Sequence, residues 1–381
     1  MDFYLTQEQQ LIQQIARDFG KEQLEPHAVE TDRKSRYPAA AIKAMAELDF
    51  LGLFYPVEYG GAGADFISYI LMLEEISRSC ASTAAIVATH CSLAAYPIYK
   101  WGSEAQKEKY LPAICTGEKL GGFALAEPGA APASGPDKVV AILDGNHYVL
   151  NGKKYFVYNG GVADVYIVFA LTQKDSATDL EGLSAFIVDA STPGLCAGRH
   201  IPKMGLCGLP TTEMIFENAH VPRENLLGTE NQGYEILIET QACAGVSAAA
   251  QAVGISQTAL DASVRYAKER VQFGSPIANL QAIQWMLAGM AGNVHMARVV
   301  TYQAAYLIMQ GKSFTVAAAI ARMLTAKAGV GVCNTAVQIH GGYGYGREMI
   351  LERLLRDVKG TMLFESISEY PQQIIAEKLL R

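Results

Sequence analysis

From Val139 to Val157 the chain reads VVAILDGNHYVLNGKKYFV, and this stretch decides the architecture of its middle third. β-Branched and aromatic residues come in short runs, which the steps Asp144-Gly145-Asn146 and Asn151-Gly152 interrupt. Asp-Gly and Asn-Gly steps favour the tight turns that join neighbouring antiparallel strands. The pattern therefore predicts strands at Val139–Leu143 and Tyr148–Leu150.

The same kind of sequence extends in both directions. The apolar period changes to that of strands near Gly121, and β-branched runs continue far beyond the quoted stretch. Further strands are predicted at Val165–Leu171 and Leu183–Val188, with Met214–Phe216 as the last one. We expect an antiparallel β-domain from about Leu120 to Pro222, within a domain that spans residues 120–228.

The residues before the β-domain have a helical pattern. From Thr6 to about Thr116 apolar residues recur at intervals of three and four. Thr6, followed by Glu8 and Gln9, is typical of the start of a first helix. Residues 1–119 are expected to form an N-terminal helical domain.

Behind Gly228 the helical pattern returns and continues almost to the end, rich in alanine at positions suited to close packing. Long helices are predicted at Gly233–Val271, Ile277–Gln310, Thr315–Gly341 and Arg347–Leu355, with a terminal helix that ends at Leu380. Four consecutive long helices favour a bundle. Residues 229–381 are therefore expected to form a C-terminal four-helix bundle, and the predicted fold class is α+β, mainly helical.

Several conspicuous residues are predicted to be structural. Trp285, Met286, Met290 and Met296 fall at helical spacing and are expected in the core. His340, between an apolar residue and a glycine pair, is expected to be hydrogen-bonded and to have no catalytic role.

Composition excludes several classes of function. The net charge is -7 and no cluster of Lys and Arg appears, which argues against a nucleic-acid partner. The seven cysteines are scattered without Cys-x-x-Cys spacing, so we expect reduced thiols and no metal site. The N-terminus resembles no targeting leader, and no uninterrupted apolar run reaches the roughly 18 residues of a membrane span. The expected location is the cytoplasm.

Six stretches, in this order, carry a family resemblance. They are Phe123–Ala130 (FALAEPGA), Lys153–Gly160 (KKYFVYNG), Val221–Gly228 (VPRENLLG), Arg270–Gly274 (RVQFG), Gln338–Tyr345 (QIHGGYGY) and Arg356–Glu365 (RDVKGTMLFE). Together they resemble the acyl-CoA dehydrogenases, in particular short-chain enzymes of the butyryl-CoA dehydrogenase type. The resemblance extends from Leu5 to Arg381.

The resemblance implies an oxidoreductase of fatty acid metabolism. Members of the family remove an α-proton from an acyl-CoA while the β-hydrogen leaves as hydride to N5 of FAD, and electron-transferring flavoprotein then accepts the electrons. The resemblance also implies a homotetramer, or a heterotetramer with a homologous chain.

Glu365 is the implied catalytic base. It directly follows the apolar pair Leu363-Phe364, and a carboxylate in a dry pocket gains base strength because desolvation raises its pKa. The alternative is a solvated acid at the edge of a helix.

Nine residues are implied to bind FAD: Leu125, Ala126, Phe156, Tyr158, Arg270, Phe273, Gln338, Gly341 and Gly342. Arg270 would reach the pyrophosphate across a subunit boundary, since a guanidinium suits a diphosphate; its alternative is a helix-end cation. Gly341 and Gly342 would allow the backbone to approach the adenosine; their alternative is a helix C-cap and loop.

The departures from the family gather around these groups. Ala126 and Tyr158 stand where the family has Thr or Ser, and the loop at Pro132 lacks the usual hydroxyl and Asp. Other departures are Ala242 and Gly245 in place of an Asp-x-x-Arg motif, Cys207 in place of Arg, Ser366-Ile367 in place of Gly-Thr, and Pro371 in place of Gln. An FAD that is bound weakly, or lost, is the consequence to expect.

Three hypotheses follow. The first is an FAD-dependent acyl-CoA dehydrogenase for a short or unusual acyl thioester. The second is a flavin-poor, non-catalytic subunit that pairs with a homologous chain. The third is a non-redox lyase that acts on an acyl-CoA and needs Glu365 alone.

Overall fold

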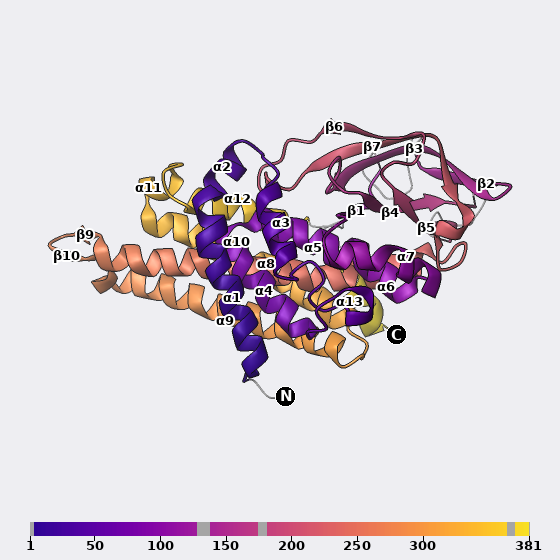
Figure 1. Cartoon of the computed structure of the whole chain (residues 1–381). Helices are drawn as coiled ribbons and strands as arrows, with labels where there is room; N and C mark the ends of the chain where they lie inside the picture. The colour runs from indigo at the N-terminus through magenta and orange to yellow at the C-terminus, as the bar shows by residue number, and fades with distance from the viewer. Residues whose placement is uncertain (1–3, 128–137, 174–180, 364–369, 381) are drawn as a thin grey trace.

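The computed structural model describes residues 4–127, 138–173, 181–363 and 370–380. Figure 1 shows the helices of the first and last thirds packed together, with the sheet of the middle third at one end of them. This arrangement confirms the predicted fold class, which is mainly helical with a central β-domain.

The first third is helical as predicted. Its elements are α1 (Gln7–Phe19), η1 (Gly20–Leu24), α2 (Glu25–Arg33), α3 (Ala39–Glu47), η2 (Val57–Tyr59), α4 (Phe66–Ser79), α5 (Ala81–Ala88), η3 (Thr89–Ala95), α6 (Tyr96–Trp101) and α7 (Glu104–Cys115). The predicted start is confirmed: the Thr6 hydroxyl accepts a hydrogen bond from Gln9 N at 3.2 Å, and Thr6 N donates to the Gln9 side chain at 3.0 Å.

The middle third forms one sheet. Its strands are β1 (Gly121–Ala124), β2 (Val140–Asp144), β3 (His147–Tyr158), β4 (Val165–Leu171), β5 (Leu183–Asp189), β6 (Leu195–His200), β7 (Thr211–Pro222) and β8 (Leu226–Leu227). Their order is β6-β7-β3-β1-β4-β5-β8, and β2 pairs with β3 and β4. The predicted strands are all present.

Two details of the predicted sheet were wrong. β1 runs parallel to β4, from the pair Gly121 and Val165 to the pair Ala124 and Val168, so the sheet is mixed and not purely antiparallel. β1 lies between β3 and β4. It runs antiparallel to β3 and parallel to β4. In addition, β7 is not the last strand, because β8 pairs with β5.

The last third consists of long helices. They are α8 (Gly233–Glu269), α9 (Gln281–Met309), α10 (Thr315–His340), α11 (Gly342–Tyr345), α12 (Leu351–Thr361) and α13 (Tyr370–Leu380). Between α8 and α9 lie the short hairpin strands β9 (Val271–Gln272) and β10 (Ser275–Pro276) and the turn η5 (Ile277–Asn279). The helix predicted at Arg347–Leu355 was misplaced: it begins at Leu351 and continues to Thr361, because a turn occupies the preceding residues.

A buried histidine joins the first third to the sheet. His90 Nδ1 accepts from Gly121 N at 2.9 Å, and its Nε2 lies 3.1 Å from the Ile114 carbonyl. Burial lowers the pKa of His90 to about 4, so the ring is neutral and donates through Nε2. The start of β1 is thereby held against η3 and α7.

The sheet also contacts the last third directly. In the loop between β6 and β7, Leu206 N donates to the buried Asp357 carboxylate of α12 at 2.7 Å. Burial raises the pKa of Asp357 to about 6. Next to it, Arg356 forms an ion pair with Asp32 at 2.6 Å. These contacts connect α2, α12 and the β-domain.

The predicted core positions on α9 were only partly right. Met290 is buried, but Trp285 is 68% exposed and Met286 and Met296 are also exposed. These three side chains lie on the face of α9 that points away from α8 and α10.

Two helices, α8 and α10, are long and apolar enough to cross a membrane by length and composition alone. In the protein, 89% and 50% of their apolar windows are buried. Burial in a protein core also selects apolar composition, so these helices give only weak evidence for a span.

Candidate functional site

A buried ion pair holds the loop that follows β1. The ammonium of Lys154 on β3 donates to Glu127 Oε1 at 2.7 Å and to the Leu125 carbonyl at 2.9 Å. Val139 N donates to the same carboxylate oxygen at 2.9 Å. The side chains of Lys154 and Glu127 are only 2% and 8% exposed. Burial lowers the pKa of Lys154, and the carboxylate of Glu127 opposes that shift.

Phe156 lies in a bulge of β3 beside this loop. Between the pairs on either side of it, β3 advances by three residues and β7 by two. Phe156 has a φ of 59°, in the left-handed region. Tyr155 N donates to the Ala126 carbonyl at 2.8 Å, so the loop runs next to the bulge. Leu125, Ala126 and Phe156 remain partly or fully exposed there, and we call these three residues the ledge.

Tyr158 occupies the end of β3 next to the ledge. It pairs with Thr211 on β7 and with Phe123 on β1, and it is almost fully buried. Its ring stands edge-on to that of Phe156, with 6.2 Å between the centroids. A phenol ring thus lies against Phe156 at the end of β3.

Unpartnered polar atoms accompany the ledge. The amide nitrogen of Asn159 donates to the Gly121 carbonyl at 2.9 Å and to the Ile86 carbonyl at 3.2 Å. Within the described part of the chain, however, Asn159 Oδ1 and Thr212 Oγ1 are buried without a hydrogen-bond partner. Buried polar atoms usually have one. The ledge offers an exposed apolar surface, which fits the planar ring system of FAD.

The second group of predicted FAD residues lies on and near the hairpin. β9 and β10 project from the free end of α8 and α9, away from the β-domain (Figure 1). Phe273 at the tip is 92% exposed and has a φ of 53°. The Arg270 guanidinium lies 5.8 Å from the centre of the Tyr343 ring, which brings the hairpin base next to α11.

Gln338, Gly341 and Gly342 lie at the end of α10, on the surface. Gly341 has φ 58° and ψ -137°, a conformation that requires glycine. A Cβ added to Gly341 or Gly342 would meet no described atom. Within one chain, therefore, packing requires glycine at neither position, and only the backbone conformation of Gly341 does. His340 is structural as predicted: its Nδ1 lies 2.8 Å from the Ala336 carbonyl and its ring stacks on Tyr266.

The structure therefore brings the predicted FAD residues into two groups. Leu125, Ala126, Phe156 and Tyr158 are together in the β-domain, and Arg270 and Phe273 are near Gln338, Gly341 and Gly342. Figure 1 shows the two groups at opposite ends of one chain. One chain alone cannot hold one FAD with both groups, which agrees with the expectation that Arg270 acts across a subunit boundary.

Glu365 and Pro132 lie outside the described residues. The segment that carries Glu365 leads directly into α13, where Pro371 and Ile374 line a small gap together with Gly245 of α8 and Arg322 of α10. Arg322 is only 5% exposed, and a Cβ on Gly245 would lie 3.5 Å from its Cδ. The buried Arg322 thus lies next to Gly245 and lines the same gap as α13.

Sequence reasoning did not single out Arg322 or the pair Lys154 and Glu127. A lone arginine within the alanine-rich run of α10 was the available signal for the first. Lys154 and Glu127 both lie in stretches that carried the resemblance, but only the fold shows that they touch.

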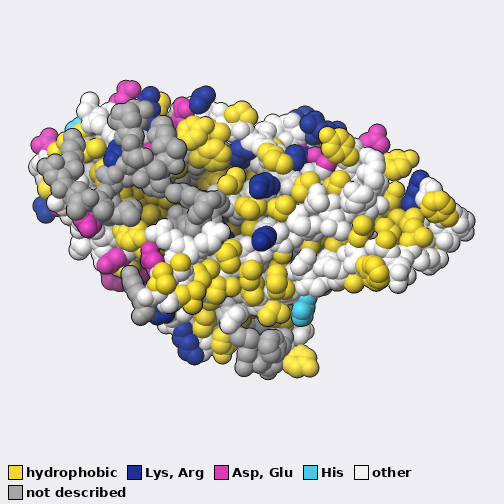
Figure 2. Space-filling model, turned by 180° about the vertical axis from the view of Figure 1, so that it is seen from behind, with side chains coloured by type: hydrophobic (Ala, Val, Ile, Leu, Met, Phe, Trp, Pro, Cys, Tyr) yellow, Lys and Arg dark blue, Asp and Glu magenta, His cyan; other side chains and the backbone are white. Residues whose placement is uncertain are grey.

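An apolar surface covers part of the long helices. Trp285, Met286, Met296 and Val299 are exposed on α9. Figure 2 shows hydrophobic side chains spread over the region of the long helices on the face seen from behind. Large exposed apolar surfaces mark contacts with other molecules.

Comparison with known proteins identifies the family. Sequence profiles of the N-terminal, middle and C-terminal domains of acyl-CoA dehydrogenase match residues 6–118, 122–219 and 231–380. The acryloyl-CoA reductase (NADH) of Anaerotignum propionicum is 44% identical over 100% of this chain and 96% of its own.

Solved structures agree with the sequence matches. Butyryl-CoA dehydrogenase from Megasphaera elsdenii superposes with a TM-score of 0.96 at 40% identity, over 100% of both chains. A chain from the structure described as the electron transferring flavoprotein of Acidaminococcus fermentans also gives 0.96, at 41% identity over 100% of both chains. The present chain therefore belongs to the acyl-CoA dehydrogenase family.

Proposed function

We propose that the chain is an FAD-dependent acyl-CoA dehydrogenase that acts on a short acyl-CoA thioester. The observation that carries this proposal is the ledge of Leu125, Ala126 and Phe156, which the buried pair Lys154 and Glu127 holds in place. The ledge occurs in a fold that matches butyryl-CoA dehydrogenase over the whole chain, and this match supports a short acyl-CoA as the substrate.

Glu365 takes the α-proton in this proposal. The thioester carbonyl makes that proton acidic, and a carboxylate behind two apolar residues is a stronger base than one in water. When bound, FAD supplies the acceptor for the β-hydrogen. The ledge would orient the ring, and Arg270 of a neighbouring subunit would neutralise the pyrophosphate through charge-assisted hydrogen bonds.

The electron partner in the proposal is an electron-transferring flavoprotein. The match to a chain from the Acidaminococcus fermentans electron transferring flavoprotein structure supports this choice. The match to acryloyl-CoA reductase suggests that the same site could also catalyse the reverse reaction, the reduction of an enoyl-CoA, in the cell.

FAD is proposed to bind more weakly than in a typical member. Ala126 and Pro132 carry no side-chain hydroxyl, and Tyr158 carries its hydroxyl at the far end of a ring. Each hydrogen bond to the flavin that is lost in this way would cost about 0.5 to 1.5 kcal/mol. Together they would remove about 2 to 4 kcal/mol, or roughly 30- to 1,000-fold in affinity. The bulk of Tyr158 beside Phe156 favours a second candidate, a flavin-poor subunit paired with a homologous chain.

A tetramer is the proposed assembly, in the cytoplasm. The exposed apolar face of α9 and the exposed Phe273 support association with further subunits. The seven free cysteines suit a reducing compartment. A well-folded monomer at micromolar concentration in sedimentation would contradict the assembly.

The test of the function is flavin binding followed by turnover. The visible spectrum of the purified protein is recorded, and its colourless fraction is titrated with FAD by calorimetry. Saturable binding at micromolar FAD, and oxidation of butyryl-CoA by the loaded protein with an artificial electron acceptor, are expected. No binding at about 100 μM FAD, where even a 10 μM site would be mostly filled, would favour the flavin-poor subunit.

A matched pair of variants refines this test. Tyr158→Thr should tighten FAD binding by opening the space beside the ledge. Tyr155→Thr, which changes the neighbouring aromatic residue and leaves Tyr158 in place, serves as the control. Equal effects of the two changes would mean that the ring of Tyr158 does not restrict the flavin.

A further inference from the structure

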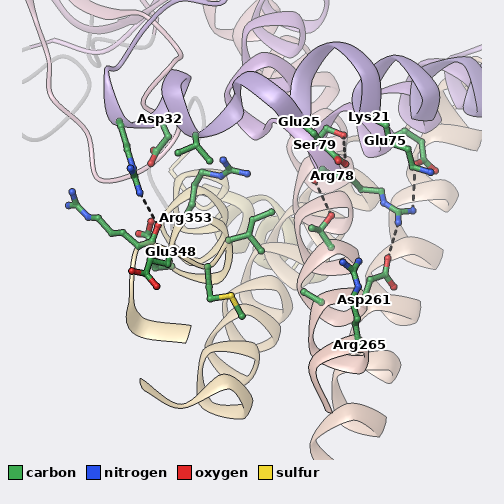
Figure 3. A pocket seen from close by; sticks show the side chains of 18 of the residues that line it. Lys21, Glu25, Asp32, Glu75, Arg78, Ser79, Asp261, Arg265, Glu348 and Arg353 are labelled. Atoms are coloured by element: carbon green, nitrogen blue, oxygen red, sulfur yellow. Dashed lines mark hydrogen bonds and ion pairs between the residues drawn. The ribbon is translucent and has the colours of Figure 1, made fainter. Parts of the chain in front are cut away.

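A charged cavity of about 610 Å³ lies among helices from the first and last thirds of the chain. Its walls come from η1, α2 and α4 on one side and from α8 and α12 on the other, as Figure 3 shows. None of the residues predicted to bind FAD lines it. Its size is that of a pocket for a small organic ligand.

Most carboxylates of this cavity are paired with arginine. Arg356 pairs with Asp32 and with Glu352, Arg17 pairs with Glu75, and Arg78 pairs with Asp261, at 2.6 to 2.8 Å. Three arginines thus neutralise three of these four carboxylates, because Arg356 is shared between Asp32 and Glu352.

A surplus of cations remains. Lys21, Arg33, Arg265, Arg347 and Arg353 line the cavity, and none of them forms an ion pair with another described residue. Seven cations and six carboxylates line the cavity, and Arg356, which pairs with two of these carboxylates, raises the excess to two positive charges. In a protein of net charge -7, this cavity is a local positive site that attracts anions.

The surplus cations surround the space. Figure 3 shows Arg353 on α12 and Arg265 on the neighbouring helix α8, both on the side of the cavity that faces the first-third helices. Arg33 extends from α2 and donates to the Arg347 carbonyl at 3.0 Å, which holds that loop at the rim. Guanidinium groups on neighbouring helices can bind successive phosphates of one ligand through paired hydrogen bonds.

Part of the lining is apolar. Val29, Ala262, Met349 and Ile350 contribute hydrocarbon surface to the same cavity. A ligand with a charged end and a flat apolar end would use both parts. From the cation surplus, the arginines of α8 and α12 and this apolar part, we infer that the cavity binds a nucleoside polyphosphate as a site separate from the predicted FAD residues.

Calorimetry on the assembled, FAD-loaded protein tests the inference. ATP and inorganic triphosphate are titrated separately, each at low and at moderate salt. ATP is expected to bind saturably and more weakly at higher salt, and triphosphate alone is expected to bind less tightly, because it lacks the base. If 1 mM ATP gives no saturable binding heat, the inference is wrong. If triphosphate binds as tightly as ATP, the cavity does not recognise the nucleoside part.

A double variant and a control locate the site. Arg265→Gln with Arg353→Gln should weaken ATP binding by about 10- to 100-fold, because two charge-assisted hydrogen bonds are removed, while FAD content stays unchanged. Arg223→Gln removes an exposed arginine that lines none of the four cavities described and should change nothing. Unaltered ATP binding by the double variant, or abolition of binding by saturating CoA in the wild type, would place ATP elsewhere.

Photolabelling gives a second readout that does not depend on a variant. An 8-azido-ATP probe bound in this cavity should label peptides from residues 258–265 or 347–353, and excess ATP should prevent the labelling. Labelling confined to the β-domain would refute the site.

Discussion

The ledge and the hairpin, the two regions predicted to hold FAD, are built in opposite ways. The ledge is tied to the interior by Lys154, whose ammonium reaches both Glu127 and the Leu125 carbonyl with almost no exposure. The hairpin consists of two-residue strands and carries Phe273 at its tip, 92% exposed. One region is rigid within a single chain, and the other has little around it.

This difference indicates that the ledge is complete within one chain and that the hairpin needs a second subunit. The ledge is preorganised by contacts within the chain, so it can orient a ring without further ordering. The hairpin is a projecting arm, and Phe273 at its tip is almost fully exposed among the described residues. Arg270 and Phe273 are therefore expected to act only when another subunit covers them, and the four changes below test that division.

The largest effect is expected from Glu365→Gln, which leaves both regions intact. The amide keeps the shape of the carboxylate but has no basicity, so turnover should fall by about 10² to 10⁴-fold. FAD affinity and assembly should be unchanged, as measured by calorimetry and sedimentation. A near wild-type rate would remove Glu365 as the base.

Lys154→Met removes the ion pair that holds the ledge in place. It leaves the Glu127 carboxylate buried without its cation, so the free energy of unfolding should fall by about 3 to 5 kcal/mol, with weaker FAD binding. Urea denaturation of the protein without FAD measures the first effect. Lys153→Met, at the exposed neighbouring position, is the control and should cost little; similar losses in both would show that the ion pair does not stabilise the loop.

Asp357→Asn tests the connection between the β-domain and α12 through pH. Burial raises the pKa of folded Asp357 to about 6 from an ordinary value of 3.8, so the wild type loses stability as the pH rises through this range. The asparagine does not ionise and can still accept from Leu206 N. The stability of the variant relative to wild type should therefore increase by about 2 to 3 kcal/mol from pH 4 to pH 6.5.

Thermal or urea unfolding at a series of pH values measures this difference. Glu352→Gln, which removes a partly exposed carboxylate from the same helix, provides a comparison. A constant difference between Asp357→Asn and wild type across the range would mean that Asp357 stays ionised in the folded protein.

The smallest effect on the chain itself is expected from Phe273→Ala. The side chain has almost no contact within its own chain, so monomer stability should change by less than about 0.5 kcal/mol. FAD affinity or subunit association should nevertheless weaken by about tenfold, as measured by FAD titration and by sedimentation at falling concentration. Unchanged affinity and association would show that the hairpin tip does not reach a second subunit.

The elements with strong local signals could be predicted from sequence. β4, with seven consecutive buried residues, and the capping box at Thr6 were found because periodicity and caps are properties of neighbouring residues. β6 was missed: LCAGRH contains few β-branched residues and is largely exposed, so its pairing with β7 supplies the strand. The predicted start of α12 was misplaced for a similar reason. Arg33 of the distant helix α2 holds the turn before α12 through the Arg347 carbonyl, and the local sequence does not show this contact.

The sequence by itself determined the order of helical and β regions, the family and the set of residues that could form a site, because periodicity and motif order are written along the chain. Tertiary structure alone decided which of those residues meet. It placed Lys154 against Glu127 across 27 positions and Arg322 opposite Gly245, and it sent Phe273 to the far end from Phe156. Contacts between distant residues depend on how helices and strands pack, and that packing is a property of the whole chain.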